Sequence, residues 1–391
     1  MESTDISFSS RDSVTGQLRG LTADEMETVL PTIGTGSSQI NYSLQQAFEL
    51  AGNLQINTMR LESGSSIAGP GASNASYGLY GNTGGLLTLS LTTGGIIAFA
   101  GNTGINVGAL AATAAPYYFW APSADSTLDI TGHLISAQSL TFSGFGTMTL
   151  NSQAYHTGQT TVNNGTLILN GGDNTLLVNA TASTPTLPAL AINGGTVELN
   201  GNNQAVGSLF SNSPVPGAGG TIRNSASNMV TLTSVTQGTT TYSGVIGGNL
   251  HFSKYGNATL TLTGENTYSG DTIVGANTLV LRDGGSLKNT SSVTLNYAGL
   301  QLDQSGNNAA NNLLPNLLPT DSSGIITAPL FMRGGVLTLT GAGSQDWTQE
   351  FASVSALAGQ NSIVLQPLVN QGSTVKLIID DLLRDPASQS T

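Results

Sequence analysis

The chain has 391 residues, 50 of them glycine, and only 8% are Asp, Glu, Lys or Arg, against roughly 25% in a typical globular domain. A hydrophobic fraction of 38% excludes a disordered chain, and the absence of cysteine excludes disulfides and thiolate chemistry. A formal net charge of −12 would repel nucleic acid and anionic lipid, and no apolar run approaches the ~20 residues of a transmembrane helix, so we expect no nucleic-acid partner and no membrane insertion.

Residues 1–53 differ in pattern from the rest and are expected to form an N-terminal segment or cap. Thr22 is followed three residues later by Glu25, a capping-box pattern, and Pro31 then ends the segment, which predicts a short helix near residues 22–30. Residues 40–51 fit a helical stripe, yet the alternation that follows them is that of a strand. Periodicity therefore leaves both readings of 40–51 open.

Residues 54–391 repeat one simple pattern. A turn of Gly or Asn precedes four to eight residues that alternate apolar with Thr or Ser, and another turn follows, as in 165–170 (GTLILN) and 335–341 (GVLTLTG). Alternation with a period of two between turn formers predicts short strands with one buried face.

Two copies of a longer unit lie near residues 145–171 and 256–282. Thr147 and Thr259, which begin the first strand of each copy, are 112 residues apart, and the copies match except for a one-residue slip at the tyrosine, Tyr155 or Tyr268. Such a unit cannot bury its apolar face without neighbours stacked above and below it. The repeat therefore predicts an all-β solenoid, a parallel β-helix over residues 54–391, with Gly and Asn at its corners.

The second copy resembles a known repeat. Residues 256–274 (GNATLTLTGENTYSGDTIV) are similar to the autotransporter-associated β-strand repeat of bacterial passenger domains, and residues 18–21 and 382–384 are similar to the flanks of large verrucomicrobial and planctomycete repeat proteins. The resemblance implies a right-handed parallel β-helix at the bacterial cell surface that acts as a scaffold or adhesive stalk. It also favours strands for residues 40–51.

On these grounds we expect a structural or adhesive extracellular protein, a β-helical stalk or fibre-forming segment of a larger secreted protein. Stacked aliphatic columns would stabilise it without any reacting group. The expected partners are other copies of the chain, associating head-to-tail or laterally through exposed strand edges, and matrix or host glycans. We expect no catalytic residue, no cofactor and no metal site.

Two other function classes stay open as alternatives. A polysaccharide-acting β-helix enzyme, a lyase or glycosidase, needs two or three carboxylates on one face, and the candidates are Glu265, Asp271 and Asp283. That reading requires the three acids to share one groove. The other class is a glycan-binding module without catalysis.

A glycan-binding module needs exposed aromatic rings, and the densest aromatic run is 117–120 (YYFW). Tyr117, Tyr118 and Trp120 are the candidates for glycan binding, although strand alternation places half of such a run inside.

The three histidines, His133, His156 and His251, lack the paired spacing of zinc sites. When the tyrosines of the two copies are aligned, His156 corresponds to Ser269 at a corner. We therefore expect His156 to be a surface turn residue.

Overall fold

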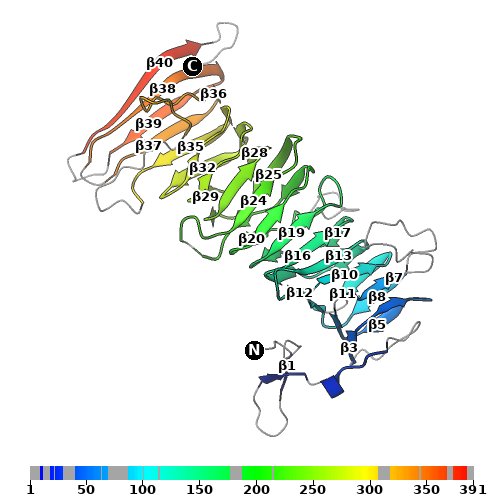
Figure 1. Ribbon diagram of the computed structural model, residues 1–391. Helices are drawn as coiled ribbons and strands as arrows, with labels where there is room; N and C mark the ends of the chain where they lie inside the picture. Colours follow the sequence, from blue (N-terminus) through cyan, green and yellow to red (C-terminus); the bar gives the residue numbers. More distant parts are fainter. Residues whose placement is uncertain are drawn as a thin grey trace. The chain divides into compact units, whose positions relative to one another are not determined.

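The computed structural model describes residues 9–11, 18–21, 23–29, 40–62, 64–68, 87–99, 101–112, 115–176, 187–213, 215–306, 318–342, 345–367 and 373–384 (Figure 1). This part of the chain is nearly all β, in several all-parallel sheets whose strands recur about every third element, as in a parallel β-helix. The predicted fold class is confirmed. Among the described residues no helix is long and apolar enough to cross a membrane.

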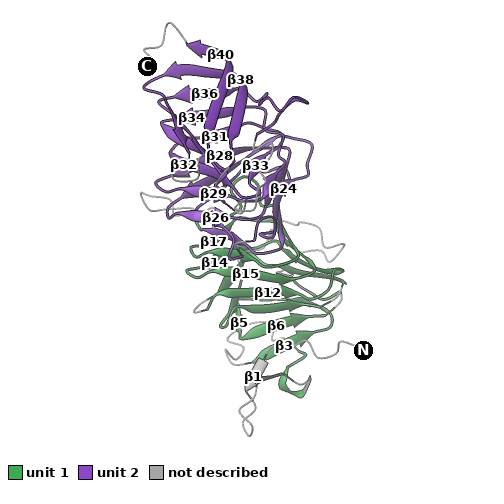
Figure 2. Ribbon diagram, turned by 90° about the vertical axis from the view of Figure 1, so that its left-hand side faces the viewer, with its two compact units in different colours: residues 1–188 green, residues 189–391 purple. Residues whose placement is uncertain are grey.

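The chain divides into two compact units, residues 1–188 and 189–391, coloured separately in Figure 2. From β3 (Asn41–Leu44) onward in unit 1, three successive strands make one turn of the coil, and each strand from β3 to β16 (Thr147–Leu150) pairs with the strand three places further along. The first sheet of unit 1 contains β3 (Asn41–Leu44), β6 (Thr58–Leu61), β9 (Gly95–Ala98), β12 (Tyr117–Ala121), β15 (Leu140–Gly144) and β18 (Thr160–Val162). The second contains β4 (Ala47–Glu49), β7 (Ser66–Ala68), β10 (Gly101–Asn106), β13 (Ser126–Ile130), β16 (Thr147–Leu150) and β19 (Thr166–Leu169). The third contains β5 (Leu54–Ile56), β8 (Thr88–Leu91), β11 (Ala109–Ala112), β14 (His133–Ser136) and β17 (Ala154–His156).

Paired strands place equivalent residues of successive turns side by side, because each parallel pair holds its register. In the first sheet one such column is entirely buried and consists of Tyr42, Met59, Ile96, Phe119, Phe142 and Val162. In β12 the residues between buried positions face outward, since buried and exposed positions alternate along it. The period-two pattern in the sequence thus corresponds to inside and outside positions of the coil.

In the described part of the N-terminal segment, one short turn is helical. The helix expected near 22–30 is the 3-10 helix η1 (Ala23–Glu25), which follows the antiparallel pair β1 (Ser9–Arg11) and β2 (Leu18–Gly20); Thr22 and residue 30 lie outside the described residues. Glu27 then bridges to Tyr42, with the Glu27 N–H donating to Asn41 and the Ser43 N–H donating to Glu27. These bonds to β3 take the backbone groups that a longer helix would use. Residues 40–51 form the strands β3 and β4, as the resemblance favoured.

Unit 2 contains two long parallel sheets. The β25 sheet consists of β22 (Gln204–Val206), β25 (Val230–Thr236), β28 (Leu250–Gly256), β31 (Thr272–Val274), β34 (Val293–Asn296), β36 (Leu330–Arg333), β38 (Trp347–Ala358) and β40 (Val375–Arg384). The β32 sheet consists of β26 (Thr240–Tyr242), β29 (Leu260–Leu262), β32 (Asn277–Arg282), β35 (Ala298–Asp303), β37 (Val336–Thr340) and β39 (Ser362–Gln366). Shorter parallel sets are β20 (Leu190–Ile192) with β23 (Leu209–Phe210), β21 (Thr196–Glu198) with β24 (Thr221–Asn224) and β27 (Val245–Gly248), and β30 (Glu265–Asn266) with β33 (Ser286–Leu287).

The core of unit 2 is again a set of aliphatic columns. Across the β32 sheet, Leu260, Leu279, Leu300 and Leu337 are in register and completely buried. The two repeat copies form the same succession of strands: β16 to β19 in residues 145–171, and β29 to β32 in residues 256–282. Outward positions between the columns form the surface on which the site described next lies.

Candidate functional site

The aromatic run 117–120 lies in β12, where alternation separates its rings. Tyr117 is completely buried, and its hydroxyl donates to the carbonyl oxygen of Leu110 at 2.7 Å. Burial raises the pKa of Tyr117. Tyr117 is therefore excluded as a glycan-binding residue, because a ligand on the surface cannot contact it. Tyr118 and Trp120 do face outward, with 54% and 37% of each residue exposed.

The three acids of the enzyme alternative lie in three different elements, each with its own basic partner. Glu265 in β30 is 3.5 Å from Lys288 Nζ, Asp271 directly before β31 contacts His251, and Asp283 directly after β32 pairs with Arg282. Within the described ranges, no three or more His, Cys, Asp or Glu side chains come together in a way that could hold a metal ion. The structure thus gives each of these acids a different side-chain partner.

His156 is buried, so the expectation of a surface turn residue is wrong. Its Nε2 lies 2.6 Å from the hydroxyl oxygen of Thr160, and burial lowers the pKa of His156 to about 4. The 112-residue offset, applied without the slip, matches His156 to Tyr268 and Thr160 to Thr272. Tyr268 is also buried and makes a 2.6 Å hydrogen bond to Thr272, so the two copies keep one bond to the threonine hydroxyl with a different partner side chain.

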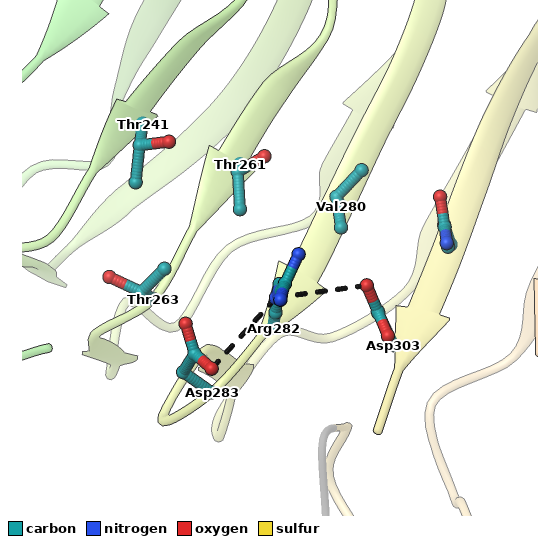
Figure 3. Close-up of a pocket in the computed structure, with 8 residues that line it drawn as sticks. Thr241, Thr261, Thr263, Val280, Arg282, Asp283 and Asp303 are labelled. Atoms are coloured by element: carbon teal, nitrogen blue, oxygen red, sulfur yellow. Dashed lines mark ion pairs between the residues drawn. The ribbon is translucent and has the colours of Figure 1, made fainter. Parts of the chain in front are cut away.

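The structure brings together a polar group that the sequence did not single out, on the outer face of the β32 sheet. Two hollows of about 470 Å³ and about 400 Å³ adjoin there and share Gln301. We call them together the β35 groove. The first hollow, shown in Figure 3, is lined by Thr241, Thr261, Thr263, Val280, Arg282, Asp283, Gln301 and Asp303. The second is lined by Asn277, Thr278, Tyr297, Ala298, Gly299, Gln301, Gly334, Val336 and Thr338.

The floor of the β35 groove follows from strand alternation. Leu300 and Leu302 of β35 are buried, so the residues between and beside them, Gly299, Gln301 and Asp303, belong to the outward set. Register places Thr261, Val280 and Gln301 in one row across the sheet; Figure 3 shows the first two of these and Thr241 side by side. β-Branched residues such as these threonines favour strands and leave a hydroxyl on the surface.

Arg282 is the cation of the groove. Its Nε lies 3.9 Å from Asp283 Oδ1 and 3.9 Å from Asp303 Oδ2, as the dashed lines in Figure 3 mark. The Asp303 carboxylate is only 8% exposed, and its Oδ1 accepts hydrogen bonds from the Ser305 N–H at 2.8 Å and the Ser305 hydroxyl at 2.6 Å. Asp303 is therefore held in place, whereas the Arg282 side chain, 46% exposed, is accessible to a ligand.

Gln301 is also held by neighbours. Its Nε2 donates to the Thr340 hydroxyl at 3.0 Å, and that hydroxyl donates to Gln366 Oε1 at 3.3 Å. Because Gln301 is in register with Thr338 of β37, this chain of hydrogen bonds runs diagonally over the next two strands of the sheet. The amide oxygen of Gln301 and the groups of Arg282 and Asp303 present donors and acceptors together, the arrangement that binds polar, uncharged ligands.

Tyr297 lies at the other end of the groove, at the turn between β34 and β35. It is 74% exposed, and its φ of 51° is in the left-handed region. A Cβ on Gly334 of the next turn would come 2.8 Å from the Tyr297 ring, so the ring lies against glycine backbone.

Sequence reasoning missed the Arg282–Asp303 pair and Tyr297. The signal for the pair was the 21-residue distance between its members, about one turn of the coil, next to a repeat copy whose strands were already predicted. The conformation of Tyr297 has no signature in the sequence. No protein-family model, no curated protein and no solved structure matches this chain.

Proposed function

We propose that this chain is a structural or adhesive segment of a secreted surface protein, a β-helical stalk displayed outside a bacterial cell. The observation that carries the proposal is the set of buried, in-register columns along both units, because such a coil is stabilised along its whole length by neighbouring turns alone. The resemblance of residues 256–274 to autotransporter-associated repeats supports the bacterial surface as its location.

The outer face supports the same role. Uncharged side chains hydrogen-bond from one turn to the next: Asn57 Nδ2 donates to Asn41 Oδ1 at 2.8 Å, and Asn170 Nδ2 donates to Asn151 Oδ1 at 2.6 Å. Because the amide and hydroxyl groups of the outer face hydrogen-bond to one another, this face needs few charged residues, in agreement with a charged fraction of 8%. Such a surface suits a spacer outside the cell.

Location is the part of the proposal that an experiment tests first. Antibodies against the chain are applied to intact and to lysed cells of the organism that encodes it, and intact cells are also treated with a protease. We expect labelling of intact cells that the protease removes. Labelling confined to lysed cells would overturn the proposal.

Self-association belongs to the proposal and has its own test. The exposed large hydrophobic residues of β39 and β40 are Ile363, Leu365, Leu382 and Leu383. Exposed apolar residues that lie close together favour packing against another copy of the chain. Sedimentation velocity over a range of concentrations should show larger species, and a constant monomer at all concentrations would contradict this part.

Glycan binding is the second candidate function, and the β35 groove and the exposed Tyr118 and Trp120 are the observations that favour it. It is compatible with an adhesive stalk, since adhesion needs a ligand. The two aromatic locations lie in different units, so substitutions in one leave the other intact.

A further inference from the structure

The corners between the β25 sheet and the β32 sheet contain one unexpected residue. Five successive corners each hold a residue of positive φ: Gly256 (92°), Asn277 (52°), Tyr297 (51°), Gly334 (65°) and Gly359 (66°). Glycine and asparagine tolerate this conformation, whereas a bulky side chain in it is a rare outlier. Among the five, only Tyr297 is of a residue type for which this backbone conformation is unfavourable.

The Tyr297 side chain makes few contacts within the fold that could offset the energy cost of its backbone conformation. Most of the residue is in solvent, and the part that is covered lies over Gly334. Strained residues that the fold itself does not need are found at binding and catalytic sites. The geometry therefore points to a ligand as the reason for the aromatic ring.

The neighbours of Tyr297 along β35 suit a sugar chain. Gly299 follows two residues on, and its φ is outside the left-handed region. A Cβ on Gly299 would come 3.0 Å from the Thr278 hydroxyl oxygen, so the glycine keeps the floor beside that threonine low. Glycine inside a strand often marks a close approach by a ligand. Gln301 and Asp303 continue the same outward row, and at ~3.3 Å per residue the row from Tyr297 to Asp303 is about 20 Å long, enough for a short oligosaccharide.

The charges of the groove decide the class of sugar. Arg282 is the cation of the groove, and it already lies between the carboxylates of Asp283 and Asp303. The chain as a whole has a net charge of −12. Both facts disfavour a polyanion such as a polyuronate, whereas hydroxyl groups can donate to the amide oxygen of Gln301 and accept from Arg282.

We propose that the β35 groove binds a neutral polysaccharide, with one sugar ring stacked on Tyr297 over Gly299 and with hydroxyl groups of the following sugars hydrogen-bonded to Gln301 and Arg282. This deepens the proposed adhesive role and rests on it only for the biological setting. Binding is measured on the purified chain, so the result for the groove does not depend on where the protein is located in the cell.

Affinity electrophoresis tests the proposal with five soluble probes in the gel: a β-glucan, a galactomannan, dextran, polygalacturonate and alginate. At least one of the three neutral polymers should retard the 391-residue chain, and the two acidic polymers should not. Tyr297→Gly should weaken binding at least about tenfold, equivalent to ~1.4 kcal/mol. Tyr297→Trp keeps an aromatic face and should bind within about threefold of the native chain.

A matched variant removes an exposed aromatic ring elsewhere. Phe145→Ala lies in unit 1, outside both candidate glycan locations, and should leave retardation unchanged. Thermal melting separates loss of binding from loss of fold, because Tyr297→Gly relieves backbone strain and should melt at a higher temperature than the native chain while binding less. The proposal is overturned by no retardation in any neutral polymer, by preference for an acidic one, by unchanged binding of Tyr297→Gly, or by loss of binding in Phe145→Ala. If surface labelling succeeds and retardation fails, only the groove is refuted.

Discussion

His156 gives the most quantitative prediction, because it is the buried titratable group of one repeat copy and Tyr268 of the other copy is not titratable in the same range. The folded-state pKa of His156 is lowered by burial to about 4, against 6.5 in an unfolded chain. The unfolded chain therefore binds a proton that the folded chain excludes, and stability is lost as the pH falls from about 6.5 to about 4.

The magnitude follows from linkage. At about pH 7.5 the histidine contributes almost nothing to the pH dependence, and at about pH 4.5 it lowers the free energy of unfolding by about 2.5 kcal/mol. His156→Tyr installs the residue of the second copy, and it also removes a buried Nδ1 that has no hydrogen-bond partner within the described structure. The variant should therefore lose about 2.5 kcal/mol less than the native chain between the two pH values.

Urea unfolding of both chains at the two pH values, followed by circular dichroism, measures the difference. His156→Gln keeps a side-chain hydrogen bond to Thr160 within reach and does not titrate, so it tests the reasoning if tyrosine is too large for the site. His133→Gln, at a position that is only partly buried, is the control and should follow the native chain. Equal pH dependence of the native chain, His156→Tyr and His156→Gln would refute the reasoning.

Three further predictions concern stability. Tyr297→Gly should raise the free energy of unfolding by about 1 kcal/mol, since a left-handed backbone costs non-glycine residues ~1–2 kcal/mol; an unchanged or lower melting temperature would contradict the strain. Glu198→Ala should cost about 2–3 kcal/mol, because its buried carboxylate accepts from Arg223 Nε at 2.9 Å and from the Ser225 N–H and hydroxyl at 2.9 Å each. Glu265→Ala, which removes an exposed ion pair, should lower the free energy of unfolding by at most ~0.5 kcal/mol. Urea unfolding measures both glutamate variants, and an equal loss of stability in the two would be inconsistent with this account. Leu300→Ala should cost about 2–5 kcal/mol and Thr261→Ala much less, because one lies in the buried column and the other on the outer face; chemical denaturation compares them, and similar losses would argue against the columns.

Local alternation and turn residues were enough to predict the fold. Leu167 and Leu169 are buried and Ile168 between them is less so, as a period of two requires. The one-turn helix η1 and the buried His156 were beyond such reasoning for two reasons. Bonds from Glu27 to β3 determine where the helix ends, and a gap placed at the wrong residue moved His156 from the inside to a corner.

The β35 groove depends on which turns lie next to each other, and turn length varies along the chain. Thr340 is in register with Asp303 although 37 residues separate them, because the segment between β35 and β36 is long, whereas Asp303 and Arg282 are only 21 residues apart. Period-two alternation gives the face of each residue but not its neighbour on the next strand. The 21-residue spacing of Arg282 and Asp303 was therefore the only sequence signal for the groove; the hydrogen bond of Gln301 to Thr340 and the conformation of Tyr297 were not predictable.

The central claim, that successive turns pair in parallel and in the stated register, can be tested directly by disulfide trapping, since the native chain has no cysteine. Thr141→Cys with Thr161→Cys in unit 1, and Thr241→Cys with Thr261→Cys in unit 2, place thiols on directly paired residues. Parallel neighbours lie ~4.8 Å apart, within the range of Cα separations that a disulfide spans. Thr141→Cys with Asn163→Cys, shifted by two residues, is the control. The account predicts rapid, nearly complete cross-linking of both in-register pairs and little in the shifted pair; equal cross-linking of shifted and in-register pairs, or none in either, would contradict it.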